Sequence, residues 1–319
     1  MKITVLDGFT TNPGDLSWDE LGRLGDLTVY DRTPRELTAE RSAGSEILLT
    51  NKTVLDNELL RSLPGLRYVG VLATGYNVID TNEARRLGII VTNIPAYSTS
   101  SVAQLTFALI LELCLHVQRH SDSVIEGKWS DSPDFTFRDY PLTELSGLTI
   151  GIIGFGNIGR KVCEIAIAFG MKVIAISRSR SDAPECPGFE WVETVELLSR
   201  SDIVSIHCPL TPETAGLINT DSLKLMKKNA FLINTSRGPI IAEQDLAAAL
   251  NEGIIAGAGL DVLASEPPAE DNPLLKAKNC IITPHIAWAT LESRRRLINQ
   301  AVKNIKAFLS GSPVNVVSR

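Results

Sequence analysis

The fold is decided by the stretch Leu148-Thr149-Ile150-Gly151-Ile152-Ile153-Gly154-Phe155-Gly156-Asn157-Ile158-Gly159. An apolar strand pattern runs into a G-x-G-x-x-G turn, and a helical pattern follows it, which is the context that this motif requires. The first glycine permits a tight turn, the second removes a Cβ that would block a pyrophosphate, and the third lets helix and strand pack closely. The helix N-terminus then faces the phosphates. We therefore predict that these residues bind a dinucleotide: Gly154, Phe155, Gly156, Asn157, Ile158 and Gly159.

The next strand, expected over 172–177, indicates which dinucleotide binds. An NAD site of this type places Asp or Glu about 20 residues after the glycines, where it bonds the ribose 2′-hydroxyl. Here the strand ends in Ser177-Arg178-Ser179-Arg180. Ser177, Arg178 and Arg180 can bond a 2′-phosphate that a carboxylate would repel. The sequence favours NADP(H), and NAD(H) stays open if the two arginines only form a solvated loop end.

Short apolar runs alternate with helical patterns along the rest of the chain, which indicates parallel sheets with helices on their faces. Strands are expected at 3–6, 28–30, 47–50, 68–72 and 89–91, and a second series at 149–154, 172–177, 202–207, 230–234, 257–261 and 280–283. We predict an α/β protein of two doubly wound parallel-sheet domains. A Rossmann dinucleotide-binding domain (101–286) is inserted into a flavodoxin-like substrate domain (1–100 plus 287–319), to which the C-terminal helix at 291–309 returns.

Two segments between the strand series have a different character. Residues 101–117 predict one long, mostly apolar helix that is buried on more than one side. Residues 127–145 are polar and aromatic without clear periodicity, and a segment of that length is usually functional or contacts a partner.

Composition excludes several classes of protein. The 319 residues carry a net charge of −6, which argues against a nucleic-acid partner. Five cysteines (114, 163, 186, 208 and 280) form no CxxC, so we predict free thiols and no metal site. The first residues form a strand pattern rather than a signal peptide, and no apolar run reaches about 20 residues. We expect a cytoplasmic protein that makes no membrane contact.

Three candidate catalytic residues each follow a predicted strand: Arg237 in Asn234-Thr235-Ser236-Arg237-Gly238, Glu266 in Ala264-Ser265-Glu266-Pro267, and His285 in Thr283-Pro284-His285. Ligands of open α/β sheets bind beyond the carboxyl ends of the strands, so all three can meet a nicotinamide there.

The order and spacing of these three residues resemble those of the D-isomer-specific 2-hydroxyacid dehydrogenase family, and the resemblance covers nearly the whole chain. Ala73-Thr74-Gly75-Tyr76-Asn77 resembles the family's substrate loop. The segments 6–18 and 129–135 look most like those of its glycerate dehydrogenase branch, the hydroxypyruvate and glyoxylate reductases.

The chemistry fits the residue types. Arg237 can bond the carboxylate and keto oxygens of a 2-keto acid through two fixed N–H groups. His285 can donate a proton to the keto oxygen, and Glu266 would hold the imidazole and favour its protonated form. The resemblance implies that the substrate is hydroxypyruvate or glyoxylate, which would be reduced to D-glycerate or glycolate.

The resemblance implies further site residues. The N–H groups of Thr74 and Gly75 complete carboxylate binding. Separately from the resemblance, we expect Trp288 to line the substrate side, because it follows His285 closely in the chain. The expected cofactor-lining residues are His207, Cys208, Pro209, Thr214, Thr235, Ser236 and Asp261. The aromatic segment 129–140 is expected to contact a second subunit or to border the active site, so we predict a homodimer.

Two alternatives stay open. A D-lactate-type or other 2-keto-acid reductase that uses NADH would carry the same motifs, because the size of the substrate pocket cannot be inferred from sequence. The corepressors that share this fold act chiefly as dinucleotide-responsive scaffolds. Retention of Arg237, Glu266 and His285 disfavours that class.

Overall fold

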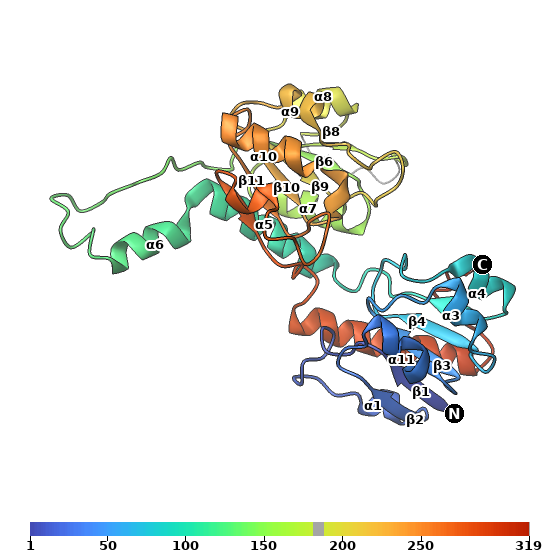
Figure 1. Cartoon of the computed structure of the whole chain (residues 1–319). Coiled ribbons are helices and arrows are strands. Elements are labelled where there is room, and N and C mark those ends of the chain that lie inside the picture. The colour runs from blue at the N-terminus through green and yellow to red at the C-terminus, as the bar shows by residue number, and fades with distance from the viewer. Residues whose placement is uncertain (181–187, 319) are drawn as a thin grey trace. The chain divides into compact units, whose positions relative to one another are not determined.

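The chain forms two compact units, each built on its own parallel sheet (Figure 1). The computed structural model describes residues 1–180 and 188–318. Unit 1 comprises Met1–Ser98 and Trp288–Arg319, and unit 2 comprises Thr99–Ala287. The predicted fold class, two doubly wound α/β domains with parallel sheets, is confirmed.

Unit 1 has the strand order β2-β1-β3-β4-β5. Its strands are β1 (Lys2–Val5), β2 (Asp26–Val29), β3 (Ile47–Thr50), β4 (Tyr68–Val71) and β5 (Ile90–Thr92). Its helices are α1 (Asp19–Gly22), η1 (Arg35–Leu37), α2 (Thr38–Ser42), α3 (Asn57–Arg61), α4 (Thr81–Arg86) and α11 (Leu291–Leu309). Helix α11 covers one face of this sheet, where Leu297 and Ile305 pack with Ile3 and Tyr68 in one buried cluster. A second buried cluster joins α3 and α4 to strand residues such as Val69.

Unit 2 has the strand order β12-β11-β10-β9-β6-β7-β8. Its strands are β6 (Thr149–Ile153), β7 (Lys172–Ile176), β8 (Phe189–Trp191), β9 (Ile203–Ile206), β10 (Phe231–Asn234), β11 (Gly257–Leu260) and β12 (Cys280–Ile282). Its helices are α5 (Thr99–Leu115), α6 (Val117–Ile125), α7 (Asn157–Ala168), α8 (Thr194–Arg200), α9 (Thr220–Leu225), η2 (Gly238–Ile240), α10 (Glu243–Glu252) and η3 (Pro273–Lys276). The chain runs outward from β6 through β7 to β8 and then returns to pair β9 with the other side of β6. This reversal between β6 and β9 is where doubly wound sheets bind ligands.

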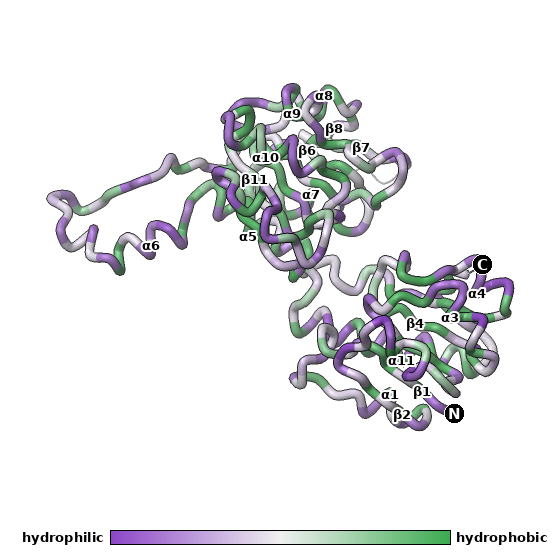
Figure 2. The backbone as a smooth tube through the Cα atoms, viewed as in Figure 1, coloured by the Kyte–Doolittle hydropathy of each residue, from purple (hydrophilic) through white to green (hydrophobic). Residues whose placement is uncertain are grey.

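Two clusters of buried hydrophobic residues form the core of unit 2. Hydrophobic residues are frequent along its strands and along α5 and α7, while hydrophilic and hydrophobic residues alternate around α6 (Figure 2). Leu109 and Ile110 of α5 pack with Ile150 and Ile233 of the sheet. The thiols of Cys114 and Cys163 lie in the same core, and Cys186 lies outside the described residues.

The single helix predicted over 101–117 is wrong at its C-terminal end. Helix α5 ends at Leu115, His116 adopts a left-handed backbone conformation with φ 49°, and α6 begins at Val117. The two helices are bent by 56°. In the described residues no single helix is long and apolar enough to cross a membrane, and only α5 and α6 taken together reach that length and composition.

Helix α6 and the segment that follows it extend away from the sheet of unit 2 (Figure 1). We call residues 117–143 the arm. No residue of α6 is buried. The return segment is held to α6 and to the residues on either side of this helix. Tyr140 lies against the rings of His116 and His120, and Asp139 forms an ion pair with Lys128.

Candidate active site

The glycine-rich turn after β6 has the geometry of a dinucleotide cradle. Gly154 has φ +95°, and a Cβ there would lie 2.6 Å from the backbone nitrogen of Cys208. A Cβ on Gly159 would lie 2.2 Å from the carbonyl oxygen of Gly154. In contrast, a Cβ on Gly156 meets no atom within 4 Å, so open space borders the N-terminus of α7 at this residue. Two glycines are thus required by packing, and the third leaves room for a bound group, as a pyrophosphate site needs.

The loop after β7 presents basic side chains. Ser177 is partly exposed, and Arg178 and Arg180 are exposed. Arg180 forms an ion pair with Glu193. The pKa of Glu213 lies below its usual value, chiefly because of a hydrogen bond from the Thr211 side chain and in smaller part because of the Arg178 charge. Arg180 therefore already has a carboxylate partner, whereas Arg178 forms no ion pair within residues 1–180 and 188–318.

The loop after β9 borders the glycine turn. The Nε2 atom of His207 lies 2.8 Å from the Ser205 hydroxyl, and burial lowers the pKa of His207 to about 3. This imidazole is therefore neutral at physiological pH. The Thr214 hydroxyl donates to the Pro209 carbonyl at 2.7 Å and accepts from the Thr211 N–H at 2.7 Å. Thr214 thus shapes the turn that follows the strand.

The backbone around Arg237 is held by a buried asparagine at the end of β10. Asn234 is fully buried, and its side chain accepts from the Ser236 N–H at 3.0 Å and donates to the Arg237 carbonyl at 2.9 Å. The Ser236 hydroxyl donates to the Cys208 carbonyl at 2.5 Å, and Thr235 shares a 3.2 Å hydrogen bond with Thr106 of α5. The role of Asn234 was not predicted from the sequence, although a polar residue at the end of an apolar strand is a usable signal.

Gly238 brings the Arg237 loop against the loop that carries Glu266. A Cβ on Gly238 would lie 2.0 Å from the carbonyl carbon of Leu263, so no larger residue fits there. The Leu263 N–H in turn donates to the Oε1 atom of Glu266 at 3.1 Å. The two loops are therefore in backbone contact.

His285 and Glu266 form a direct pair. The Nδ1 atom of His285 lies 2.6 Å from Oε2 of Glu266, and the two side chains are 25% and 34% exposed. A carboxylate at Nδ1 places a proton on that nitrogen and orients the ring. Nε2 is then the ring nitrogen that can exchange a proton with a ligand.

Asp261 holds the chain around His285. His285 has φ +54°, which is uncommon for a residue with a side chain. The Asp261 carboxylate accepts hydrogen bonds from the Ile286 N–H (2.9 Å), the Ala287 N–H (2.8 Å) and the Thr283 hydroxyl (2.6 Å). Burial raises the pKa of Asp261, while these hydrogen bonds act in the opposite direction. The family resemblance suggested a cofactor contact, and the structure shows that both carboxylate oxygens have partners next to His285.

In unit 1 the predicted substrate loop follows β4. The Asn93 side chain donates to the Thr74 carbonyl at 2.7 Å, and the Thr74 hydroxyl donates to the Ile94 carbonyl at 2.9 Å. Within residues 1–180 and 188–318, the N–H groups of Thr74 and Gly75 have no hydrogen-bond acceptor. Two adjacent N–H groups without acceptors suit an anion.

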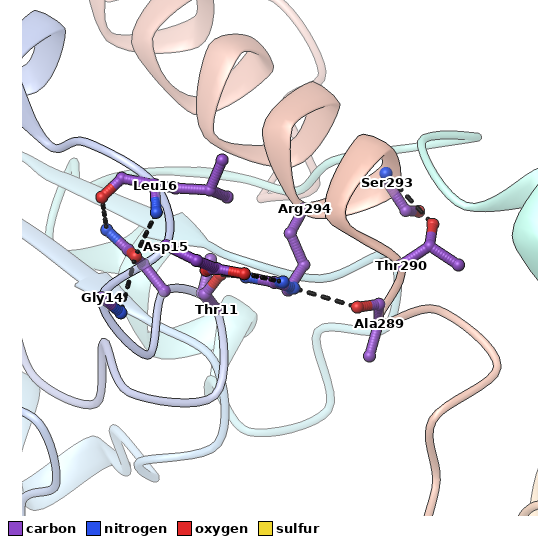
Figure 3. A network of polar contacts seen from close by, with 9 residues as sticks. Thr11, Gly14, Asp15, Leu16, Ala289, Thr290, Ser293 and Arg294 are labelled. Carbon is purple, nitrogen blue, oxygen red and sulfur yellow. Dashed lines mark hydrogen bonds and ion pairs between the residues drawn. The ribbon is translucent and has the colours of Figure 1, made fainter.

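Trp288 begins the return of the chain to unit 1. Its ring meets that of Tyr97 edge-on, with centroids 6.4 Å apart. The following residue is held by Arg294 of α11, which donates from Nε to the Ala289 carbonyl at 2.9 Å and pairs with Asp15 through two bonds of 2.7 and 2.6 Å (Figure 3). Arg294 also lowers the pKa of Asp15 through this contact.

Each unit therefore carries a defined group of the predicted residues. Unit 2 holds the glycine turn and all three predicted catalytic residues, on loops that follow β10, β11 and β12. Unit 1 holds Thr74, Gly75 and Trp288. Among the described residues, no cluster of His, Cys, Asp and Glu could hold a metal ion. A dinucleotide cradle beside a paired His–Glu couple and an arginine loop defines a class of protein, the dinucleotide-dependent dehydrogenases.

Comparisons with known proteins identify the family. Residues 107–287 match the family model described as "D-isomer specific 2-hydroxyacid dehydrogenase, NAD binding domain". A hydroxypyruvate reductase of Blautia hydrogenotrophica is 53% identical over 322 residues, which cover 100% of both chains. A glyoxylate reductase of Thermococcus litoralis is 42% identical over 90% of this chain and 87% of its own length. A solved structure of an acyclic imino acid reductase in complex with NADPH and D-Arg matches with a TM-score of 0.88 and 34% identity, over 99% of this chain and 100% of the other. The chain belongs to the D-isomer-specific 2-hydroxyacid dehydrogenase family.

Proposed function

We propose that this protein reduces hydroxypyruvate or glyoxylate to D-glycerate or glycolate with NAD(P)H. The observation that carries the proposal is the 2.6 Å His285–Glu266 pair in the unit that also holds the dinucleotide cradle. The similarity to a hydroxypyruvate reductase over the whole chain supports the substrate.

The reduction needs one hydride and one proton. A dinucleotide held at the glycine turn before α7 would supply the hydride. His285, protonated at Nε2 and held at Nδ1 by Glu266, gives the proton to the keto oxygen. Arg237 binds the carboxylate and keto oxygens and so fixes the orientation of the keto carbon. In unit 1, the N–H groups of Thr74 and Gly75 have no acceptor among the described residues and suit a carboxylate. The balance is keto acid plus NAD(P)H plus H⁺ giving hydroxy acid plus NAD(P)⁺.

The test is the loss of absorbance at 340 nm with glyoxylate, hydroxypyruvate, pyruvate and phenylpyruvate. We expect hydroxypyruvate and glyoxylate to have the highest kcat/KM. A preference for pyruvate or phenylpyruvate would favour a lactate-type reductase, and no turnover of any keto acid would favour the scaffold class.

Two variants test the proposed roles of His285 as proton donor and Arg237 as substrate-binding residue. His285→Ala should lower kcat by about 10²–10⁴, the usual share of a positioned proton donor. Arg237→Lys should lower kcat by about 10², because lysine lacks the planar pair of N–H donors. Dinucleotide affinity, measured by fluorescence titration, is the control for folding and should stay unchanged in both variants. Near-normal turnover of His285→Ala would contradict its role.

For the cofactor we propose a preference for NADP(H). Ser177 stands where NAD sites of this type have an acid, and the exposed Arg178 can bond a 2′-phosphate. The NADPH bound in the similar imino acid reductase supports this choice, whereas the description of the matching family model names NAD. The kcat/KM ratio of NADPH to NADH tests the proposal. Ser177→Asp should shift that ratio toward NADH by at least about tenfold, because like charges repel. A clear NADH preference of the unaltered protein would refute it.

We also propose that the protein is a homodimer whose contact includes the arm. Large apolar side chains of the arm are exposed, among them Phe135 (90%), Ile125 (80%) and Trp129 (52%). Exposed apolar groups gathered on one projecting segment are typical of an interface between protein chains.

A further inference from the structure

Asp7, at the carboxyl end of β1, binds three consecutive backbone N–H groups of the loop after β3. Its Oδ1 atom accepts from Asn51 at 2.7 Å, and Oδ2 accepts from Lys52 at 2.6 Å and from Thr53 at 2.8 Å. Strands β1 and β3 are neighbours in the sheet of unit 1, so the carboxylate reaches this loop directly. Hydrogen bonds to an ionised acceptor are among the stronger ones in proteins. The loop 51–53 is therefore fixed by one side chain.

The loop 51–53 is stabilised by an internal hydrogen bond and by hydrogen bonds to the residue that follows β4. The Thr50 hydroxyl donates to the Thr53 carbonyl at 2.9 Å, which closes the turn. The buried side chain of Asn51 donates to the Leu72 carbonyl at 2.8 Å, and the Leu72 N–H donates to the Thr50 carbonyl at 2.7 Å. Both bonds reach the residue at which β4 gives way to the predicted substrate loop.

The substrate loop is held from its other side by the residues after β5. The Ile94 N–H donates to the Ala73 carbonyl at 3.0 Å, and the Asn93 side chain donates to the Thr74 carbonyl at 2.7 Å. These contacts leave the N–H groups of Thr74 and Gly75 without acceptors among the described residues. The two groups are thus oriented by bonds on both sides of them, and Asp7 provides the first of these through Asn51.

We propose that Asp7 is a positioning residue for the keto acid: through Asn51 and Leu72 it sets the orientation of the Thr74 and Gly75 N–H groups that bind the substrate carboxylate. The inference rests on the proposed function for the identity of the ligand. The coupling of Asp7 to the loop can be measured without substrate. An arrangement of this kind lowers the cost of binding, because the loop is ordered before the anion arrives.

The decisive variant is Asp7→Asn. Asparagine has nearly the same shape but one acceptor oxygen, so its amide N–H₂ must face at least one of the three N–H groups. The matched control is Asp31→Asn. Asp31 is an exposed aspartate in the loop after β2 at the same edge of the sheet.

In steady-state kinetics with hydroxypyruvate, Asp7→Asn should raise KM by about tenfold or more, the effect of losing hydrogen bonds to a charged group. We expect kcat to stay within about twofold, because the carboxylate is bound equally in the ground and transition states. The KM for the dinucleotide and the kinetics of Asp31→Asn should not change. A fall in kcat with an unchanged KM for the keto acid would show that Asp7 only stabilises the fold, and would overturn the proposal.

Amide hydrogen exchange without substrate gives a second measurement that does not depend on the reaction. Asp7→Asn should speed exchange at 51–53 and also at Leu72 and Ile94, while Asp31→Asn should leave all of them unchanged. Faster exchange confined to 51–53 would refute coupling to the substrate loop. If the unaltered protein reduces no keto acid, the proposed function fails, and the exchange result still decides whether Asp7 orders the substrate loop.

Discussion

The residue that carries the proposed proton transfer has an unusual backbone. His285 lies in the left-handed region with φ +54°, and such a conformation persists where surrounding contacts determine it. The Ile286 and Ala287 N–H groups that follow His285 both donate to Asp261, and the His285 N–H itself donates to the Asp261 carbonyl at 2.9 Å. Asp261 is 1% exposed, so water cannot replace it as the acceptor. The orientation of the imidazole is thus set by two acids, Glu266 at the ring and Asp261 at the backbone.

The variant Asp261→Asn tests whether Asp261 mainly orients His285 or mainly contacts the cofactor. An asparagine leaves at least one of the bonded donors without an acceptor, so His285 should shift. We expect kcat to fall by about 10²-fold, as for a small misplacement of a reacting group. Dinucleotide affinity should be preserved, and it would fall instead if the main role of Asp261 were to bind the nicotinamide amide. Asp271→Asn, at an exposed acid on the same loop, is the control and should keep full activity.

Two short helices of unit 1 are joined through one glutamate. Glu83 of α4 is 8% exposed at its side chain and forms ion pairs with Arg86 at 2.6 Å and with Arg61 of α3 at 2.7 Å. The hydrogen bond from Arg86, and then that from Arg61, lowers the pKa of Glu83 to about 2. The five residues of α3 and six of α4 are too few to be stable alone, so such contacts hold them in place.

This depressed pKa predicts a pH dependence of stability. In the unfolded chain a glutamate titrates near pH 4.3. The stabilisation by ionised Glu83 is therefore complete above that pH and is lost as the pH falls toward about 2. In urea unfolding, Glu83→Gln should be less stable than the unaltered protein at pH 6, and the difference should shrink steadily below pH 4. A difference in the free energy of unfolding that does not change with pH would contradict the prediction. As a control, Glu58→Gln changes an exposed residue of α3 and should be about as stable as the unaltered protein at every pH.

At the scale of the whole molecule, the two units divide the proposed work. Unit 2 holds the dinucleotide cradle and the His285–Glu266 pair, and unit 1 holds the loop with the N–H groups of Thr74 and Gly75. The arm belongs to unit 2, yet none of the residues of α6 is buried. Its conformation depends on contacts such as those of Tyr140 with His116 and His120 rather than on a core.

The arm gives a prediction about assembly. If a second copy covers its apolar side chains, the double substitution Ile125→Ser with Phe135→Ser should shift the protein from dimer to monomer in sedimentation velocity. Val195→Ser is the matched control, because Val195 is 62% exposed on α8 of the same unit and lies outside the arm. An unaltered protein that sediments as a monomer, or a double variant that stays dimeric, would refute the arm as the contact.

The sequence by itself predicted the glycine turn, the three candidate catalytic residues and the strands of the described residues except β8, which was missed. Apolar runs such as 47–50 and 149–153 become buried strands. A short run of apolar residues is a local feature of the sequence, so these strands can be predicted without knowledge of the fold. The need for glycine at 154 and 159 could also be predicted locally. The motif itself specifies a tight turn at Gly154 and close packing of helix against strand at Gly159. Helix α6 was not separated from α5, because the break at His116 depends on a single backbone conformation rather than on periodicity.

Only the tertiary structure decided which side chains support the site. Asp7 reaches 51–53, Asp261 reaches Ile286 and Ala287, and Gly238 meets Leu263, each across many residues of sequence. Strand pairing brings these partners together, and no local pattern encodes a hydrogen bond between residues that meet only when the sheet forms. The sequence therefore provided candidate catalytic residues, whereas the groups that orient them became visible only in the folded chain.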